Sequence, residues 1–192
     1  MNLDRRVLGE KAKEIGFVRD TLEKVFRLTE ILAFINSDSI LSKILILKGG
    51  TAINLTVFNL PRLSVDIDLD LAINYSLRSH IFDSVLRPIV TSVTETELMV
   101  NTLVPSELFA AKLNALMNRA AVRDLYDINN MIRFGLFDES EYEELRKNTV
   151  FYAAISAETI NKDFKTDAID DITFAKVKRD LFPVIAKKDN FD

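Results

Sequence analysis

Two short segments, one apolar and one acidic, constrain the fold of this chain more than any other feature of its sequence. The apolar residues 44–47 are followed by Lys48 and by the pair Gly49-Gly50, after which the sequence is compatible with a helix. We therefore expect a strand, a tight turn and the start of a helix in this order. A turn of this kind leaves backbone N–H groups free to bind a phosphate.

The acidic segment, residues 65–71, alternates strictly between apolar and acidic side chains. In a strand, this period of two places Asp66, Asp68 and Asp70 on one face, where their like charges repel. Carboxylates two residues apart lie about 7 Å apart along a strand, which is close enough to share divalent cations. An ordinary strand with one solvated face is the alternative, but aspartate is uncommon in strands. The pattern therefore favours a metal site at Asp66 and Asp68.

The stretch that joins the two segments is long enough for one helix and a return into an adjacent strand, so the glycine turn and the aspartates are expected to meet. Thr51 would cap the helix, whose positive N-terminal end would face an anion in the turn. Arg62 and Ser64 share the face of the aspartates by the same period of two. The Arg62 guanidinium would either bind triphosphate oxygens or pair with Asp66 or Asp70.

A predicted helix in the second half of the chain carries a line of basic side chains. At about 100° per residue, Lys112, Arg119 and Arg123 fall close to one line if the helix is continuous. If the helix breaks near Ala120, the line shortens to Lys112 and Arg119. Such a line is either a solvated surface or, opposite a cluster of aspartates, a set of cations for nucleotide phosphates. Arg123 and Asp127 are four residues apart, a spacing that allows an ion pair.

These segments belong to two blocks of sequence that follow each other in a recognisable order. In the first block, residues 48–52 and 61–69, a glycine pair precedes a spaced acid-apolar-acid. In the second block, residues 103–116 and 123–127, a lysine on a helix precedes an Arg-Asp-x-x-Asp element. Together they resemble the AbiEii/AbiGii toxin family of nucleotidyltransferases, which belongs to the DNA polymerase beta-like superfamily. The resemblance covers about residues 25–135.

The resemblance implies an α+β fold, in which a small mixed β-sheet nucleotidyltransferase core packs with helices and is followed by a helical C-terminal part. We expect the palm-like core with its N-terminal helix in residues 1–104 and the helical part in residues 105–192. Apolar spacing predicts the N-terminal helix at residues 17–34, and two further helices are predicted at residues 140–155 and 174–182.

The resemblance also implies chemical roles for individual residues. Nucleotidyl transfer leaves little covalent chemistry to the protein, so catalysis depends on positioning and on neutralising charge. Asp66 and Asp68 would hold Mg²⁺ or Mn²⁺ ions. Lys112 would bind the triphosphate of an NTP, and Asp127, or Asp124 with it, would orient Lys112 or the acceptor. The predicted catalytic residues are Asp66, Asp68, Lys112 and Asp127, and the predicted nucleotide-binding residues are Gly49, Gly50, Thr51, Arg62, Ser64, Lys112, Arg119 and Arg123.

These features predict a metal-dependent nucleotidyltransferase that acts as the toxin of a type IV toxin–antitoxin, or abortive infection, system. The resemblance implies an NTP donor and an RNA acceptor, with the 3′ end of tRNA as the expected acceptor. It also implies a cognate antitoxin that acts without stable binding. Two alternatives stay open: transfer to a hydroxyl of a partner protein, and a catalytically silent nucleotide-binding or interaction module.

The middle of the chain, residues 74–104, motivates the silent alternative because it is shorter than the family's usual spacing between the two blocks. We predict a helix at residues 77–89 and a strand at residues 94–100. Superfamily enzymes place a third carboxylate on a strand beside the acid pair, and here Glu95 or Glu97 could serve. Neither glutamate sits in a distinctive motif, so the sequence leaves the third carboxylate open.

Composition excludes several other classes of protein and site. The 192 residues include no cysteine, which excludes a disulfide framework, a thiol nucleophile and a cysteine-based metal site and suits a reducing cytoplasm. A net charge of −4 argues against a broad basic surface for nucleic acid. The sequence shows neither a basic-apolar leader nor a long apolar run, so we expect neither export nor membrane spanning. The single histidine, His80, is expected to face solvent or to cap a helix.

Overall fold

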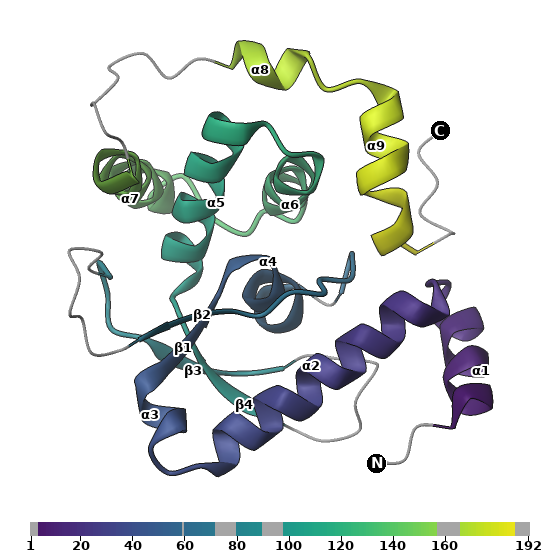
Figure 1. Ribbon diagram of the computed structural model, residues 1–192. Coiled ribbons are helices and arrows are strands. Elements are labelled where there is room, and N and C mark those ends of the chain that lie inside the picture. The colour runs from purple at the N-terminus through teal and green to yellow at the C-terminus, as the bar shows by residue number, and fades with distance from the viewer. Residues whose placement is uncertain (1–3, 59, 72–79, 90–97, 157–165, 187–192) are drawn as a thin grey trace.

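A mixed sheet with helices packed around it forms the centre of the fold (Figure 1). The computed structural model describes residues 4–58, 60–71, 80–89, 98–156 and 166–186. Within these residues the strands are β1 (Leu45–Lys48), β2 (Asp68–Leu71), β3 (Val85–Pro88) and β4 (Met99–Thr102), in the spatial order β2-β1-β4-β3. β1 pairs antiparallel with β2 and parallel with β4, and β3 pairs antiparallel with β4. The predicted α+β fold is therefore confirmed.

Helices precede and follow this sheet along the chain. The helices before β1 are α1 (Arg5–Ile15), α2 (Arg19–Ser37) and α3 (Leu41–Ile44). The helical C-terminal part comprises α5 (Pro105–Arg119), α6 (Val122–Arg133), α7 (Glu141–Ser156), α8 (Asp167–Asp170), α9 (Phe174–Asp180) and the 3₁₀ helix η2 (Phe182–Val184). In Figure 1, α2 lies below the sheet, whereas α5, α6 and α7 lie above it. None of the helices described is both long and apolar enough to cross a lipid bilayer.

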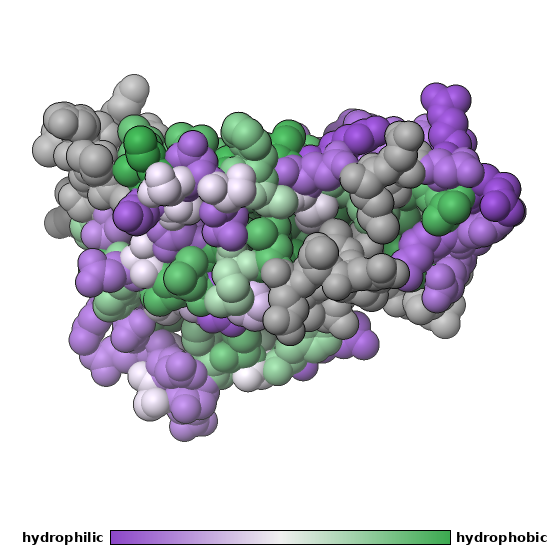
Figure 2. All heavy atoms as spheres, turned by 90° about the horizontal axis from the view of Figure 1, so that it is seen from below, coloured by the Kyte–Doolittle hydropathy of each residue, from purple (hydrophilic) through white to green (hydrophobic). Residues whose placement is uncertain are grey.

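The three helices predicted from apolar spacing are confirmed as α2, α7 and α9, with small shifts at their ends. α2 is amphipathic: Leu22, Val25 and Leu32 are buried, whereas charged side chains such as Arg27 and Glu30 are exposed. Figure 2 shows the molecule from below, where hydrophobic residues gather near the middle of the face and hydrophilic residues surround them. The apolar spacing of α2 thus reflects its packing against the core.

The predicted strand, turn and helix around the glycine pair are also confirmed. β1 ends at Lys48, and the helix α4 (Gly49–Ala52) begins at the first glycine. Gly49 has a φ of 71°, a left-handed conformation that side chains with a Cβ rarely adopt, and this allows the sharp bend from strand to helix. α4 continues into a π-helical turn, η1 (Ile53–Val57), whose residues Ile53 and Leu55 are buried in the core.

The acidic strand is shorter than the predicted residues 65–71, because β2 begins only at Asp68. The register explains this difference. Asp68 lies opposite Lys48, the last residue of β1, and beyond that point the neighbouring chain turns away into α4. Upstream of β2 the backbone finds another partner, since the Thr51 hydroxyl donates a hydrogen bond to the carbonyl of Asp66. The segment before β2 is therefore fixed to α4 instead of to a sheet.

The prediction of a helix at residues 77–89 is wrong, because its second half forms the strand β3, which pairs with β4 over its whole length. β3 is an edge strand, and an edge tolerates Pro88, which has no N–H to donate to a neighbouring strand. The strand predicted at residues 94–100 appears as β4, slightly later in the chain. Glu95 and Glu97, the candidates for a third carboxylate, lie outside the described residues.

α5 is held against the core by Phe109, whose side chain is fully buried. Its ring packs edge-to-face against Phe58 and Phe137, with centroids 5.6 and 5.9 Å apart. Aromatic pairs in this geometry stabilise a core beyond the burial of their area alone. Lys112 follows about one turn later on α5, so this packing also fixes the position of its backbone.

The predicted basic line along this helix is broken at Ala120. This residue has a left-handed φ of 45°, and its N–H donates a hydrogen bond to the carbonyl of Leu116, which ends α5 at Arg119. Arg123 therefore lies on the next helix, α6. The line shortens to Lys112 and Arg119, as expected for a broken helix.

Candidate active site

The glycine bend lies directly against the strand that carries the aspartates. A Cβ atom on Gly49 would lie 2.1 Å from the carboxylate oxygen Oδ2 of Asp68. A Cβ atom on Gly50 would lie 2.7 Å from Nη2 of Arg62 and 3.2 Å from the hydroxyl of Ser64. Only glycine allows approaches this close without displacing the neighbours. The two segments thus meet in space, as their spacing in the sequence predicted.

The three aspartates differ in their electrostatic surroundings. Nζ of Lys48 lies 2.7 Å from Oδ2 of Asp70. Burial alone would raise the pKa of Asp70, but the hydrogen bond and charge of Lys48 hold it below its ordinary value of 3.8. Asp66 and Asp68 are exposed, line one cavity and form no ion pair with another described residue. No ion pair with a described residue therefore neutralises either acid. Arg119 is influenced from a distance: its hydrogen bond to Asp124 raises its pKa most, and the charges of Asp124 and Asp68 add to this.

This donor set fits Mg²⁺ or Mn²⁺. Mg²⁺ is commonly held by one or two carboxylates, with substrate phosphates and water completing its octahedral shell. The described residues contain no group of three acidic, histidine or cysteine side chains suited to a metal ion. An ion at Asp66 and Asp68 would thus take its other ligands from substrate and water.

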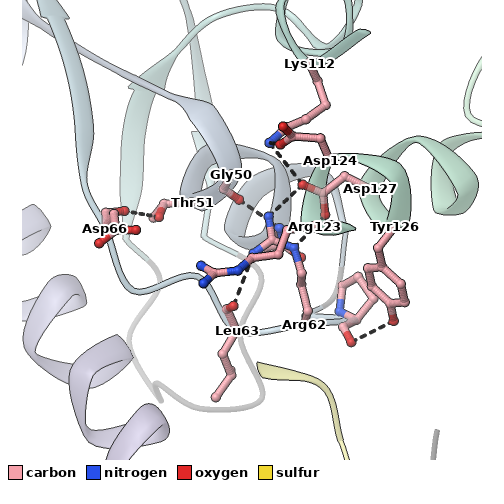
Figure 3. A network of polar contacts seen from close by, with 12 residues as sticks. Gly50, Thr51, Arg62, Leu63, Asp66, Lys112, Arg123, Asp124, Tyr126 and Asp127 are labelled. Atoms are coloured by element: carbon pink, nitrogen blue, oxygen red, sulfur yellow. Dashed lines mark hydrogen bonds and ion pairs between the residues drawn. The ribbon is translucent and has the colours of Figure 1, made fainter. Parts of the chain in front are cut away.

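Five side chains of alternating charge contact one another in a row beside the cleft, and Figure 3 shows four of them, Arg62, Asp127, Lys112 and Asp124. Arg62 binds both carboxylate oxygens of Asp127, with Nε–Oδ1 and Nη2–Oδ2 distances of 2.7 and 2.6 Å. Nζ of Lys112 lies 3.2 Å from Oδ2 of Asp127 and 2.9 Å from Oδ1 of Asp124. Arg119 is the last of these five charged side chains, with Nε 2.7 Å from Oδ2 of Asp124. The contacts predicted between Lys112 and the two aspartates of α6 are therefore present.

The alternation allows four of these five charges to be buried, because each acid contacts two cations. A buried charge destabilises a fold unless it is paired and hydrogen-bonded. Burial would raise the pKa of Asp124, but the hydrogen bonds and charges of Arg119 and Lys112 hold it below 3.8. Only the Arg119 side chain is largely exposed, at 63%. The five side chains together carry one net positive charge. Two of the cations, Lys112 and Arg119, line the cleft.

Two predicted residues make contacts that the sequence did not indicate. Arg62 is 2% exposed and pairs with Asp127, so the predicted alternative pairing with Asp66 or Asp70 is wrong. Thr51 is fully buried within α4 and donates to the Asp66 carbonyl, so it does not cap the helix as predicted. Both residues hold the segment before β2 in place.

Arg123 lines the same cavity, but its predicted ion pair with Asp127 is not formed. Its Nε donates a hydrogen bond to the backbone carbonyl of Asp180 at 3.1 Å. Asp180 is the last residue of α9 and also lines the cavity. Sequence reasoning missed this residue, because no motif marks it and it lies 57 residues further along the chain.

The cleft around Asp68 has two lobes, which share Gly50, Asp68, Lys112 and Arg119. The first, which we call the polar lobe, has a volume of about 430 Å³ and is lined beyond the shared residues chiefly by Arg62, Ser64, Asp66, Arg123, Asp124 and Asp180. The second, which we call the apolar lobe, has a volume of about 340 Å³. Its walls include Leu103, Leu108, Ala111, Ala115, Tyr152 and Ile155, and the ion pair of Lys48 and Asp70 lines it together with His80. Asp68 therefore lies where two chemically different spaces meet, whereas Asp66 lines the polar lobe alone.

A fully buried glutamate, Glu107, holds one wall of the apolar lobe together. It accepts hydrogen bonds from the N–H of Ile81 at 2.9 Å and from the Tyr152 hydroxyl at 2.6 Å. Burial and this hydrogen bond raise the pKa of Tyr152 well above its ordinary value. Nδ1 of His80 lies 3.6 Å from Oε1 of Glu107, and Nε2 lies 3.9 Å from Oδ2 of Asp70. His80 thus lines the cleft between two carboxylates, and the expectation that it faces solvent or caps a helix is wrong.

This fold and cleft carry the two sequence blocks that resemble the nucleotidyltransferase toxins. Comparison with known protein families agrees: the model described as nucleotidyl transferase AbiEii toxin, type IV toxin–antitoxin system, matches residues 30–76 and 70–191. The chain therefore belongs to the AbiEii family of nucleotidyltransferase toxins, and the resemblance is confirmed. No curated protein and no solved structure matches it significantly.

Substitutions at three glycines distinguish two effects of a side chain at Gly49, which are the strain of a positive φ and the clash with Asp68. Gly9 in α1 faces open space at an ordinary φ, Gly135 faces open space at a φ of +57°, and Gly49 combines a φ of +71° with the contact to Asp68. We expect Gly9→Ala to raise the free energy of unfolding by about 0.5–1 kcal/mol and Gly135→Ala to lower it by about 1 kcal/mol. Gly49→Ala should lower it by about 3 kcal/mol, measured by urea denaturation. Equal losses for Gly49→Ala and Gly135→Ala would contradict the close contact.

The buried carboxylate of Asp124 makes stability dependent on pH. Its folded pKa is depressed, so the stabilisation is fully present above about pH 4 and is lost as the pH falls through the lower folded pKa. At pH 7, Asp124→Asn should lower the free energy of unfolding by about 3 kcal/mol. The difference in the free energy of unfolding between wild type and Asp124→Asn should become smaller between about pH 4 and about pH 2. Urea denaturation at each pH measures it.

The matched control for this comparison is Asp167→Asn, which changes an exposed aspartate of α8. It should alter the free energy of unfolding by less than about 0.5 kcal/mol. A gap between wild type and Asp124→Asn that stays constant down to about pH 2 would contradict the assignment of the stabilisation to the ionised carboxylate.

Proposed function

We propose that this chain is an active, metal-dependent nucleotidyltransferase that transfers NMP from an NTP to an RNA acceptor, with the 3′ end of tRNA as the acceptor. The observation that carries the proposal is the acid pair Asp66 and Asp68, which no described ion pair neutralises. Asp68 lies against the glycine bend, and both acids line one cavity with the cations Lys112 and Arg119. Family membership supplies the reaction class, and this geometry supplies the parts that the reaction needs.

Asp66 and Asp68 would hold Mg²⁺ or Mn²⁺. When bound, the ions lower the pKa of the attacking hydroxyl and neutralise charge on the phosphates. The acceptor oxygen then forms a bond to the α-phosphorus, the bond from that phosphorus to the bridging oxygen breaks, and pyrophosphate leaves. The hydroxyl proton passes to solvent. The balance of charge requires cations beside the pyrophosphate, and Lys112 and Arg119, which line the cleft, would supply them.

The remaining predicted residues contribute in two ways. Gly49 and Gly50 let the backbone approach phosphate and metal closely. Arg62 acts on the nucleotide through Asp127, which it holds against Lys112. Thr51 acts through the Asp66 backbone. Ser64 and Arg123 complete the polar lobe and provide donors to phosphate.

The biological setting follows from the family, whose type IV systems pair the toxin with an antitoxin. We propose that the cognate antitoxin opposes this toxin without forming a stable complex with it. The acid pair and the cations of the cleft would then be free to bind NTP and RNA while the antitoxin is present.

The direct test is transfer of label from α-labelled NTP to total tRNA in the presence of Mg²⁺. We expect labelled tRNA with the wild type, and a loss of at least about a hundredfold with Asp66→Asn or Asp68→Asn, because each removes charge from the metal site. Asp167→Asn, on the exposed surface of α8, is the matched control and should retain full activity. Chelation of the metal should abolish transfer.

Three outcomes would overturn parts of this proposal. Label on protein instead of RNA would assign the acceptor to a partner protein. Tight binding of NTP with no product from any acceptor would identify a silent nucleotide-binding module. Equal transfer by wild type and Asp66→Asn would remove the acid pair from the mechanism.

A further inference from the structure

We propose that the apolar lobe binds the nucleoside of the NTP and leaves the polar lobe to the acceptor. This inference rests on the proposed function, because it assigns the two ends of the same substrate cleft. It goes further by naming the surface that meets the base, which neither the sequence blocks nor the family description specifies.

The two lobes share the groups that a triphosphate needs. Gly50, Asp68, Lys112 and Arg119 line both lobes, so the glycine bend, one acid of the pair and both cations stand at their junction. A triphosphate with its metal needs these groups and would lie at the junction. The nucleoside at one end of the triphosphate must then extend into one of the two lobes, and the acceptor must approach from the other.

Small and apolar side chains form two facing walls of the apolar lobe. One face of α5 presents Leu108, Ala111 and Ala115 to the apolar lobe, and Ile155 of α7 lies across from them. The two alanines are small and only partly buried, so they leave room between the helices for a flat ring. The volume of about 340 Å³ falls in the range typical of pockets for small ligands.

The polar lobe offers the opposite environment. Asp66, Asp124, Asp180 and the arginines Arg62 and Arg123 dominate its lining. A base placed among these charges would bury apolar surface against groups that prefer water or an ionic partner. The phosphates of an RNA end are better suited to this lobe, because Arg123 lines it.

The apolar lobe also carries polar groups in fixed positions. The Tyr152 hydroxyl is held by Glu107 at 2.6 Å, and Ser156 donates a hydrogen bond to the carbonyl of Tyr152 at 2.7 Å. His80 lies between the carboxylates of Glu107 and Asp70. A few fixed donors and acceptors in a mainly apolar pocket orient a ligand and allow it to be discriminated. They would meet the edge of the base or the ribose.

The experiment compares ligands with and without a nucleoside. Isothermal titration with Mg²⁺ measures the affinity of the protein for a non-hydrolysable NTP and for tripolyphosphate, which lacks base and ribose. Ala115→Leu narrows the apolar lobe with a good helix former and should weaken NTP binding by about tenfold or more, because the base no longer fits. The affinity for tripolyphosphate should not change.

The matched control is Ala154→Leu, the same substitution at an exposed position of α7 that lines neither lobe. It should leave both affinities unchanged. Thermal unfolding shows whether each variant folds. If Ala115→Leu does not fold, Ile155→Ala serves instead, because it removes an exposed part of the apolar wall and should weaken NTP binding several-fold while sparing tripolyphosphate.

The results distinguish failure of the nucleoside assignment from failure of the proposed nucleotidyltransferase function. Wild-type protein that binds tripolyphosphate as tightly as NTP, or Ala115→Leu that binds NTP like wild type, overturns the nucleoside assignment while leaving the nucleotidyltransferase intact. Normal NTP binding by Ala115→Leu with loss of transfer to tRNA would place the acceptor in the apolar lobe and also overturn the assignment. Wild-type protein that binds neither ligand overturns the proposed function itself, and the inference with it.

Discussion

The whole site depends on one close contact, between the backbone of Gly49 and the carboxylate of Asp68. The antiparallel register of β1 and β2 sets Asp68 opposite Lys48, and the bend at Gly49 then begins a helix beside that carboxylate. Because side chains alternate between the faces of a strand, a shift of one residue would turn Asp68 to the other face. Strand register and glycine conformation together therefore bring a strand end, a helix start and one acid of the proposed metal pair to the same place.

The two walls of the cleft differ in whether their charged side chains form ion pairs. On one wall, Asp66 and Asp68 have no cationic partner among the described residues, so a metal ion would relieve their repulsion. On the other wall, Lys112 is held by Asp124 and Asp127, and most of its charge is already balanced. This pairing fixes the position of the Lys112 ammonium group but leaves little of its positive charge unbalanced. Phosphoryl chemistry benefits from cations fixed in advance, because they need not reorganise as charge develops.

Features that depend on short-range sequence patterns could be predicted from the sequence. Contacts between residues far apart in the sequence became visible only in the structure. The glycine bend, the acid pair and Lys112 are marked by short-range spacing, and each was found where that spacing placed it. Arg62 was identified, but its partner Asp127 lies 65 residues away and could not be deduced from a period of two. Glu107 resembles an ordinary acid in the first turn of a helix, so nothing local shows that it is buried. The helix predicted at residues 77–89 failed because strand pairing at the sheet edge outweighed local preference.

The most direct test of the central claim is to locate a metal ion by anomalous scattering from crystals grown with Mn²⁺ and a non-hydrolysable NTP. The account predicts anomalous peaks within coordination distance, about 2.0–2.3 Å, of carboxylate oxygens of both Asp66 and Asp68. The phosphates should lie beside Gly49 and Gly50, within reach of Lys112. Bound nucleotide whose Mn²⁺ contacts neither aspartate, or that lies on a face away from the glycine bend, would contradict the account.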